Sequence, residues 1–97
     1  MMSKLLEKLP IEIFNLLHRI GGYADQRRVG CYLVGGVVRD LLLDKPTLDL
    51  DIVVETDAIE FSKVLSQKDQ TAITIYPRFK TTTLVWPRNI SVDFATA

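Results

Sequence analysis

Two aspartates separated by one residue, Asp49 and Asp51, have the spacing in this sequence that most directly suggests chemistry. Residues two apart on a strand point to the same face and lie about 6.6–6.8 Å apart. Carboxylates on one face repel each other unless a cation lies between them, and oxygen ligands favour Mg²⁺ or Mn²⁺ over Zn²⁺. The pair therefore predicts a metal site. The alternative is two solvent-facing residues on a half-exposed strand, although aspartate is a poor strand former.

A glycine pair, Gly35 and Gly36, stands between an expected strand and an expected helix. Glycines let the backbone approach a phosphate, and the N–H groups of the following helix N-terminus would point at it. Arg39 could add a charge-assisted hydrogen bond to a phosphate oxygen, while Asp40 could orient Arg39 or cap the turn. The alternative is a tight turn with a surface Arg–Asp pair, because no Walker-type Gly-Lys-Ser/Thr follows.

A third carboxylate, Asp93, lies in a segment whose alternate residues are apolar, which leaves Asp93 and Ser91 on the opposite face. Neighbouring strands lie about 4.8 Å apart, so Asp93 would join Asp49 and Asp51 if the two strands were adjacent. The sequence does not establish that adjacency. An exposed aspartate on a hairpin is the alternative.

The elements that must position these residues follow from apolar spacing and turn residues. A helix is expected from Pro10, with a break or kink at Gly21 and Gly22 and an end at Gly30. Strands are expected at residues 31–34, 48–54, 71–76, 82–86 and 90–94, and further helices at 37–43 and 58–67, the last capped by Asp57. This order predicts an α/β (α+β) fold, a mixed sheet of about five strands packed with helices.

Three further residues are expected to have structural rather than chemical roles. His18 has no cysteine or second histidine beside it in the helical segment, so we expect a structural or surface residue rather than a metal ligand. Phe79 and Trp86 are expected to pack in the core or at its edge, because no regular aromatic series suggests a base-stacking platform.

Length and composition indicate one compact globular domain. The 97 residues are 47% hydrophobic and 25% charged, which excludes a disordered, collagen-like or disulfide-stapled chain. The single Cys31 fits a reducing compartment. Twelve basic residues balance twelve acidic ones, so no global positive field suggests nucleic acid. Residues 40–60, however, hold seven acidic side chains and one basic one, which suits either a metal-bridged polyanion site or a solvated acidic helix end.

No segment suggests membrane insertion. The longest apolar runs fall far short of the roughly 20 residues that a spanning helix needs. Lys4, Glu7, Lys8 and Glu12 interrupt the apolar N-terminus, which therefore lacks the core of a signal peptide. We expect a cytoplasmic protein with no membrane partner.

The motifs together resemble a known family. The run LVGGVVRDLLL at residues 33–43, followed by DLDIVV at 49–54, is similar to the class II tRNA nucleotidyltransferases (CCA-adding enzymes) and bacterial poly(A) polymerases, within the polymerase-β-like superfamily. Residues 78–81 and 92–97 look like that family's following strands, so the resemblance covers residues 31–97. One departure is Asp44, where the family commonly has glycine. Aspartate tolerates turn geometry, so we expect little effect.

The resemblance implies roles for the candidate residues. Gly36 and Arg39 would contact the triphosphate of an incoming CTP or ATP, with Gly35 and Asp40 in the same nucleotide-binding segment. The carboxylates would be catalytic: Asp49 and Asp51 as ligands of Mg²⁺ (or Mn²⁺), and Asp93 at the family's third carboxylate position. The reaction implied is attack of the 3′-hydroxyl of tRNA or another RNA on the nucleotide's α-phosphate.

The family extends past residue 97 into neck and body regions, so we expect residues 1–97 to be one head domain with an N-terminal helical segment at 1–30. It would be part of a longer enzyme and inactive alone. Two alternatives stay open: an idle nucleotide- or Mg²⁺-binding module, and a structural fragment that self-associates through exposed apolar surface. Whether the parent enzyme adds CCA, CC, A or a poly(A) tail is also open.

Overall fold

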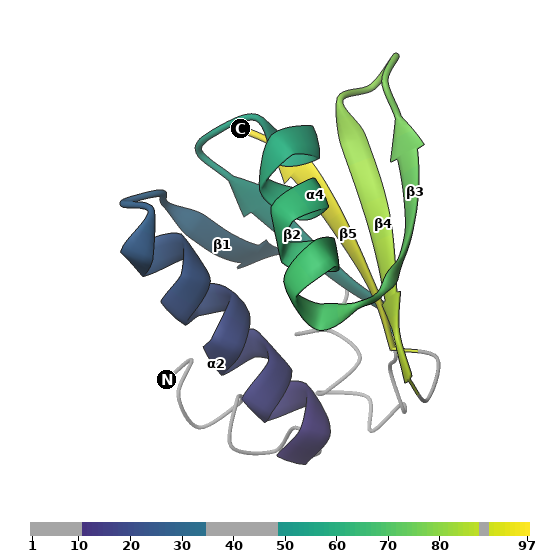
Figure 1. Ribbon diagram of the computed structural model, residues 1–97. Helices are drawn as coiled ribbons and strands as arrows, with labels where there is room; N and C mark the ends of the chain where they lie inside the picture. Colours follow the sequence, from purple (N-terminus) through teal and green to yellow (C-terminus); the bar gives the residue numbers. More distant parts are fainter. Residues whose placement is uncertain (1–10, 35–48, 88–89) are drawn as a thin grey trace.

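The computed structural model describes residues 11–34, 49–87 and 90–97, which form two helices and one five-stranded sheet (Figure 1). The helices are α2 (Ile11–Gln26) and α4 (Ala58–Asp69). The strands are β1 (Cys31–Val34), β2 (Asp49–Val54), β3 (Ala72–Tyr76), β4 (Thr81–Trp86) and β5 (Ile90–Thr96). The predicted α+β fold with a mixed sheet is confirmed. The expected helix at 37–43 lies outside the described residues, as do Gly35, Gly36, Arg39, Asp40 and Asp44.

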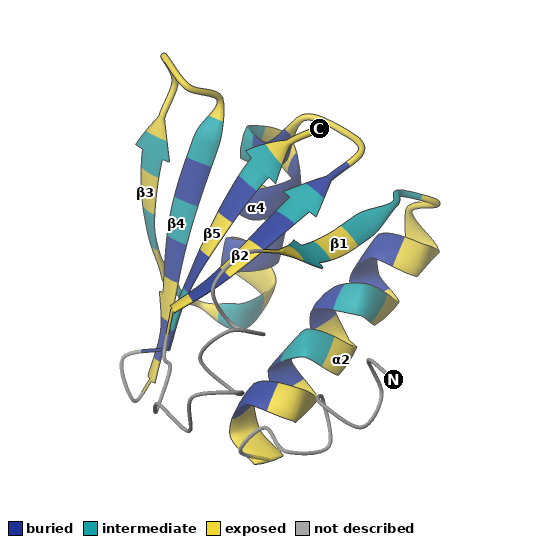
Figure 2. Ribbon diagram, turned by 180° about the vertical axis from the view of Figure 1, so that it is seen from behind, coloured by how far each residue is buried: buried dark blue, intermediate teal, exposed yellow. Residues whose placement is uncertain are grey.

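The sheet is mixed because one pair of neighbours is parallel. Its strand order is β1-β2-β5-β4-β3, with β2 and β5 parallel and every other neighbouring pair antiparallel. Both described helices lie on one side of the sheet, and the view from behind shows the sheet in front of them (Figure 2). Neither of these helices is long and apolar enough to cross a membrane.

The core lies between the two helices and the face of the sheet that they cover. Side chains alternate along β2: Leu50, Ile52 and Val54 are buried, whereas Asp49 and Asp51 are exposed on the other face. The aromatic rings of Tyr23, Phe61 and Phe94 form a contact chain from α2 through α4 to β5, with ring centroids 4.8 and 5.8 Å apart. Burial of this one face leaves the opposite face to carry polar groups.

Helix α2 runs without interruption through Gly21 and Gly22, so the predicted break is wrong. Each glycine costs about 1 kcal/mol in a helix relative to alanine. The flanking residues Ile20, Tyr23 and Ala24 are buried in the core, and their burial holds this turn of the helix in place. Packing therefore outweighs the local propensity of the glycine pair.

The end of α2 is set by Arg28 rather than by Gly30, which corrects a second expectation. Arg28 has a φ of 57°, in the left-handed region that usually favours glycine. Its N–H donates to the Asp25 carbonyl at 3.1 Å, and the Val29 N–H donates to the Ala24 carbonyl at 2.9 Å. These two bonds form a Schellman motif, which satisfies the last carbonyl groups of the helix.

Helix α4 begins where the sequence predicts. The Asp57 carboxylate accepts hydrogen bonds from the backbone N–H groups of Ile59 (2.9 Å) and Glu60 (3.5 Å), as an N-cap residue does. The chain leaves the helix at Gln70, whose φ of 54° turns it toward β3. Between these two ends, α4 contacts β3, β4 and β5.

The aromatic residues of the β3–β4 hairpin region behave differently from one another. Trp86 is buried, as expected, and its indole N–H donates to Asp69 at 2.9 Å. Phe79 is 71% exposed, so its predicted place in the core or at its edge is wrong. It lies in the turn beyond the last strand pair, Tyr76 with Thr81, where the Arg78 guanidinium stacks on its ring at 5.9 Å.

Candidate active site

Three carboxylates share the face of the sheet that the described helices leave uncovered. Asp49 and Asp51 lie on β2, and Asp93 lies on β5. Because β2 and β5 are parallel neighbours, their register places Asp51 opposite Asp93 and Asp49 opposite Ser91. The adjacency that the sequence could not establish is therefore present. Asp93 is an exposed residue of the β4–β5 hairpin, and it also lies beside Asp51.

The aspartate pair belongs to a row of side chains that crosses the whole sheet. Its members are successive Cα partners on β1, β2, β5, β4 and β3: Val34, Asp51, Asp93, Thr83 and Thr74. The Thr83 hydroxyl donates to Asp93 Oδ1 at 2.5 Å. Sequence analysis did not single out Thr83. Strand alternation places Thr81 and Thr83 on one face, but no local signal shows that Thr83 would meet Asp93.

Negative charge is concentrated at Asp51. Its pKa is raised above the ordinary value, chiefly because partial burial removes water from the carboxylate. The charges of Asp93 and Asp49 raise this pKa further, as does a hydrogen bond to Asp93 that only the protonated carboxyl can donate. A cation placed among these oxygens would relieve the repulsion.

The donor set fits a hard divalent cation. Carboxylate oxygens suit Mg²⁺ and Mn²⁺, and Mg²⁺ is usually bound by one or two carboxylates together with waters and substrate phosphates. Within residues 11–34, 49–87 and 90–97, no group of three His, Cys, Asp or Glu side chains is close enough to hold a metal ion. Of the three aspartates, Asp51 and Asp93 are direct Cα partners, and Asp49 lies two residues away along β2.

A cleft of about 520 Å³ opens over the Asp51–Asp93 pair. This volume falls within the usual range of about 300–1,000 Å³ for small-molecule sites. The residues that line it come from all five strands, with Val34 of β1 and Tyr76 of β3 among them. Its further lining residues are Ile52, Val53, Thr81, Thr82, Thr83, Phe94 and Ala95. The cleft offers carboxylates in its floor and apolar and aromatic groups beside them.

The residue that precedes the predicted nucleotide-binding segment in the sequence, Val34, lines this cleft. Val34, the last described residue of β1, is the Cα partner of Asp51. Gly35 follows Val34 directly in the sequence. The roles expected for Gly35, Gly36, Arg39 and Asp40 fall on residues outside the described ranges.

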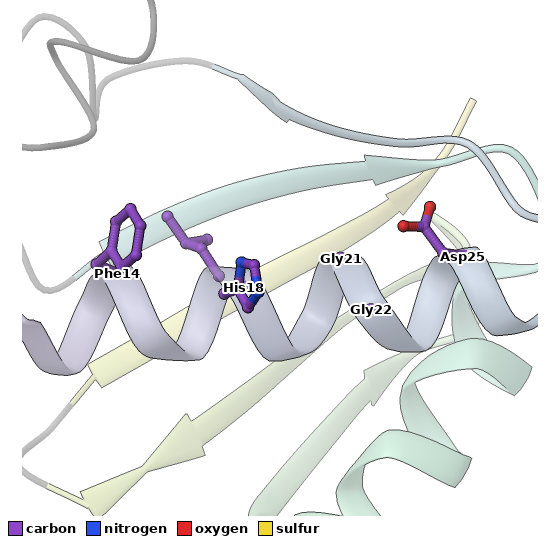
Figure 3. Close-up of a pocket in the computed structure, with 6 residues that line it drawn as sticks. Phe14, His18, Gly21, Gly22 and Asp25 are labelled. Atoms are coloured by element: carbon purple, nitrogen blue, oxygen red, sulfur yellow. The ribbon is translucent and has the colours of Figure 1, made fainter.

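A second hollow, of about 350 Å³, lies along α2 on the helix side of the sheet (Figure 3). Its lining includes His18, whose ring stacks on that of Phe14 with centroids 6.3 Å apart. His18 is exposed, which confirms its expected place at the surface. Asp49, Asp51 and Asp93 lie on the opposite face of the sheet, so this hollow is separate from the cleft.

The comparison with known families decides the membership of the chain. The model of the poly(A) polymerase head domain matches residues 31–97. The chain belongs to the poly(A) polymerase head domain family. All five strands of the described sheet lie within the matched residues 31–97.

Relatives of this head domain carry names from tRNA maturation. An A-adding tRNA nucleotidyltransferase of Geobacter sulfurreducens is 33% identical over 87 residues, which are 90% of this chain and 10% of the relative. One from Aquifex aeolicus is 44% identical over 66 residues, which are 68% of this chain and 8% of the relative. The chain therefore spans a small part of the length of these relatives.

Solved structures agree with this assignment of the head domain. A CCA-adding enzyme in complex with ATP matches 98% of this chain with a TM-score of 0.89 at 38% identity, over 23% of its own length. The Thermotoga maritima CCA-adding enzyme complexed with tRNA matches the same share with a TM-score of 0.88 and 38% identity. The fold of the family is thus shared over nearly the whole chain.

Proposed function

We propose that this chain is the catalytic head of a template-free RNA nucleotidyltransferase, which joins a nucleotide from CTP or ATP to an RNA 3′-hydroxyl. The observation that carries the proposal is the register of β2 and β5, which aligns Asp51 with Asp93 in the floor of an open cleft. Family membership and the names of the relatives support the same chemistry. Complexes of similar enzymes with ATP, CTP and tRNA favour these three as partners.

In the proposed reaction, the oxygen of the RNA 3′-hydroxyl bonds to the α-phosphorus of the nucleotide. The bond from that phosphorus to the bridging oxygen breaks, pyrophosphate leaves, and the hydroxyl proton passes to solvent. Bound Mg²⁺, or Mn²⁺, would supply charge neutralisation at the phosphates and a lower pKa for the attacking hydroxyl. No nucleophilic side chain of the protein is required.

The chain's own residues would bind and orient. Asp49 and Asp51 on β2 would hold the cation, and Asp93 would lie beside Asp51 as a further carboxylate on the neighbouring strand. The cleft walls would exclude part of the bulk water from the reacting groups, which strengthens electrostatic interactions there.

The family resemblance suggests which residues would bind the triphosphate of the nucleotide. Gly36 and Arg39 would hold it, with Gly35 and Asp40 in the same segment, since Gly35 follows the Cα partner of Asp51. An active enzyme of this kind would act on cytoplasmic RNA.

The proposal is tested in the natural polypeptide that carries this sequence. Labelled ATP and CTP are offered with tRNA that lacks its terminal CCA, tRNA that ends in CC, and an unrelated RNA. Incorporation only into the tRNA that ends in CC indicates A addition. Incorporation into both tRNAs indicates CCA addition, and incorporation into all three RNAs indicates poly(A) synthesis. Asp51→Ala is expected to lower the rate of incorporation about 10²–10³-fold, since it removes a ligand of the cation that would neutralise the reacting phosphate.

Glu60→Ala is the matched control, because Glu60 is an exposed carboxylate on α4 at the other face of the sheet. Its rate should equal that of the wild type, and circular dichroism should show both variants folded. Full transfer by Asp51→Ala would overturn the proposal. Binding of nucleotide without any incorporation would instead indicate an idle binding module.

A further inference from the structure

We propose that Thr83 is a positioning residue for the site: its hydroxyl fixes the orientation of the Asp93 carboxylate so that Asp93 and Asp51 can serve one cation. The inference rests on the proposed function, because it assumes that the carboxylates hold a metal. It assigns a task to a residue on β4, a strand that carries none of the candidate carboxylates.

Asp93 accepts a hydrogen bond from the neighbouring strand on the side away from Asp51. β5 lies between β2 and β4, so Asp93 has Asp51 as its partner on one neighbour and Thr83 on the other. The Thr83 hydroxyl donates to Oδ1 of Asp93 at 2.5 Å. This length is typical of a charge-assisted O–H···O⁻ bond, which runs from about 2.5 to 2.7 Å.

Thr83 is suited to hold a fixed position. It is half-buried, and β4 is paired on both sides along its length, with β3 and β5. A β-branched side chain has few χ1 rotamers, so the direction of the hydroxyl is set largely by the backbone. The donor therefore reaches the same oxygen of Asp93 without a large loss of side-chain freedom.

The chemistry of the donor matters as much as its position. Asp93 and Asp51 repel each other, and an exposed carboxylate without a donor would turn away from its neighbour toward water. A lysine or arginine at position 83 would hold Asp93 but would also neutralise the charge that a cation needs. A hydroxyl orients the carboxylate and leaves its negative charge available.

The same bond also joins β4 to β5, so a test must separate metal affinity from stability. The probe is Mn²⁺ alone, titrated into the 97-residue chain and followed by electron paramagnetic resonance. Thr83→Val keeps the shape of the side chain and removes the hydroxyl, whereas Thr83→Ser keeps the hydroxyl. Thr74→Val is the matched control, because Thr74 is the next member of the same row and lies on β3.

Partners of metal ligands commonly change metal affinity about 10–100-fold when they are removed. We expect Thr83→Val to weaken Mn²⁺ binding about 10-fold. Thr83→Ser and Thr74→Val should bind like the wild type. Thermal unfolding without metal identifies any variant that fails to fold, in which case Thr83→Ala replaces Thr83→Val.

Wild-type affinity in Thr83→Val, or equal losses in Thr83→Val and Thr83→Ser, would overturn the inference. Asp51→Asn, titrated in parallel, shows which proposal has failed. If Asp51→Asn loses Mn²⁺ and Thr83→Val does not, only the role of Thr83 is wrong. If the wild type binds no Mn²⁺, or Asp51→Asn binds as well as the wild type, the metal site fails and the role of Thr83 fails with it.

Discussion

Repulsion between Asp51 and Asp93 gives a prediction that needs neither substrate nor catalysis. The two residues are partners on neighbouring strands, about 4.8 Å apart. Two unit charges at that separation repel by about 0.9 kcal/mol in water and about 3.5 kcal/mol at an effective dielectric constant of 20. Both side chains are exposed, so the lower figure applies. Asp51→Asn should therefore raise the free energy of unfolding of the metal-free chain by about 1 kcal/mol at low salt.

The pH dependence of this effect has a definite sign. Burial first, and the charges of Asp93 and Asp49 after it, raise the pKa of Asp51 above its ordinary 3.8. The folded state thus binds the proton more tightly than the unfolded state, and the wild type loses stability as the pH rises from the ordinary pKa through the raised one. The advantage of Asp51→Asn should be absent below that window and complete above it.

Thermal unfolding of the metal-free chain, followed by circular dichroism, measures the effect. A gain of 1 kcal/mol raises the Tm of a domain this size by about 4–8 °C. High salt should reduce the gain, because the Debye length falls to about 3 Å at 1 M. Adding Mg²⁺ should raise the Tm of the wild type more than that of Asp51→Asn. The double variant Asp51→Asn/Asp93→Asn should have nearly the same Tm as Asp51→Asn, because the repulsion is already gone. An equal or lower Tm for Asp51→Asn near neutral pH, or the same shift in acid, would refute the reasoning.

Two further predictions concern the helices that support the sheet, and urea unfolding checks both. Asp57→Ala removes the N-cap of α4 and should lower the free energy of unfolding by about 1 kcal/mol, whereas Asp57→Asn should lose less; no loss in the alanine variant would contradict the capping bond. Gly22→Ala should raise the free energy of unfolding by about 0.5–1 kcal/mol, because nothing lies within 4 Å of the added Cβ in the continuous helix. A loss would show that α2 bends there.

Local features of the fold were predictable from the sequence. The strand expected at residues 48–54 is β2 (Asp49–Val54), and the one expected at 90–94 is β5 (Ile90–Thr96). Alternation of polar and apolar residues determines which face a strand buries, so the shared face of Asp49 and Asp51 followed directly. Asp57 was recognisable as a cap because capping involves only the next three residues.

Features that depend on distant parts of the chain were not predictable. The continuity of α2 through its glycine pair depends on the core beneath Ile20 and Tyr23, and propensity alone gave the wrong answer. The exposure of Phe79 follows from a hairpin turn that extends past the last paired residues. For α2 the environment is supplied by other elements, whereas Phe79 lies in a turn past the paired residues, which leaves its ring exposed.

The candidate site divides in the same way. The sequence by itself determined the residue types, the alternation that puts two carboxylates on one side of a strand, and the glycine pair that follows β1. Only the tertiary structure decided that Asp93 lies beside Asp51 and that Thr83 donates to it. Strand order and register are set by the burial of a common core among segments far apart in the chain, and no short stretch of sequence contains that information.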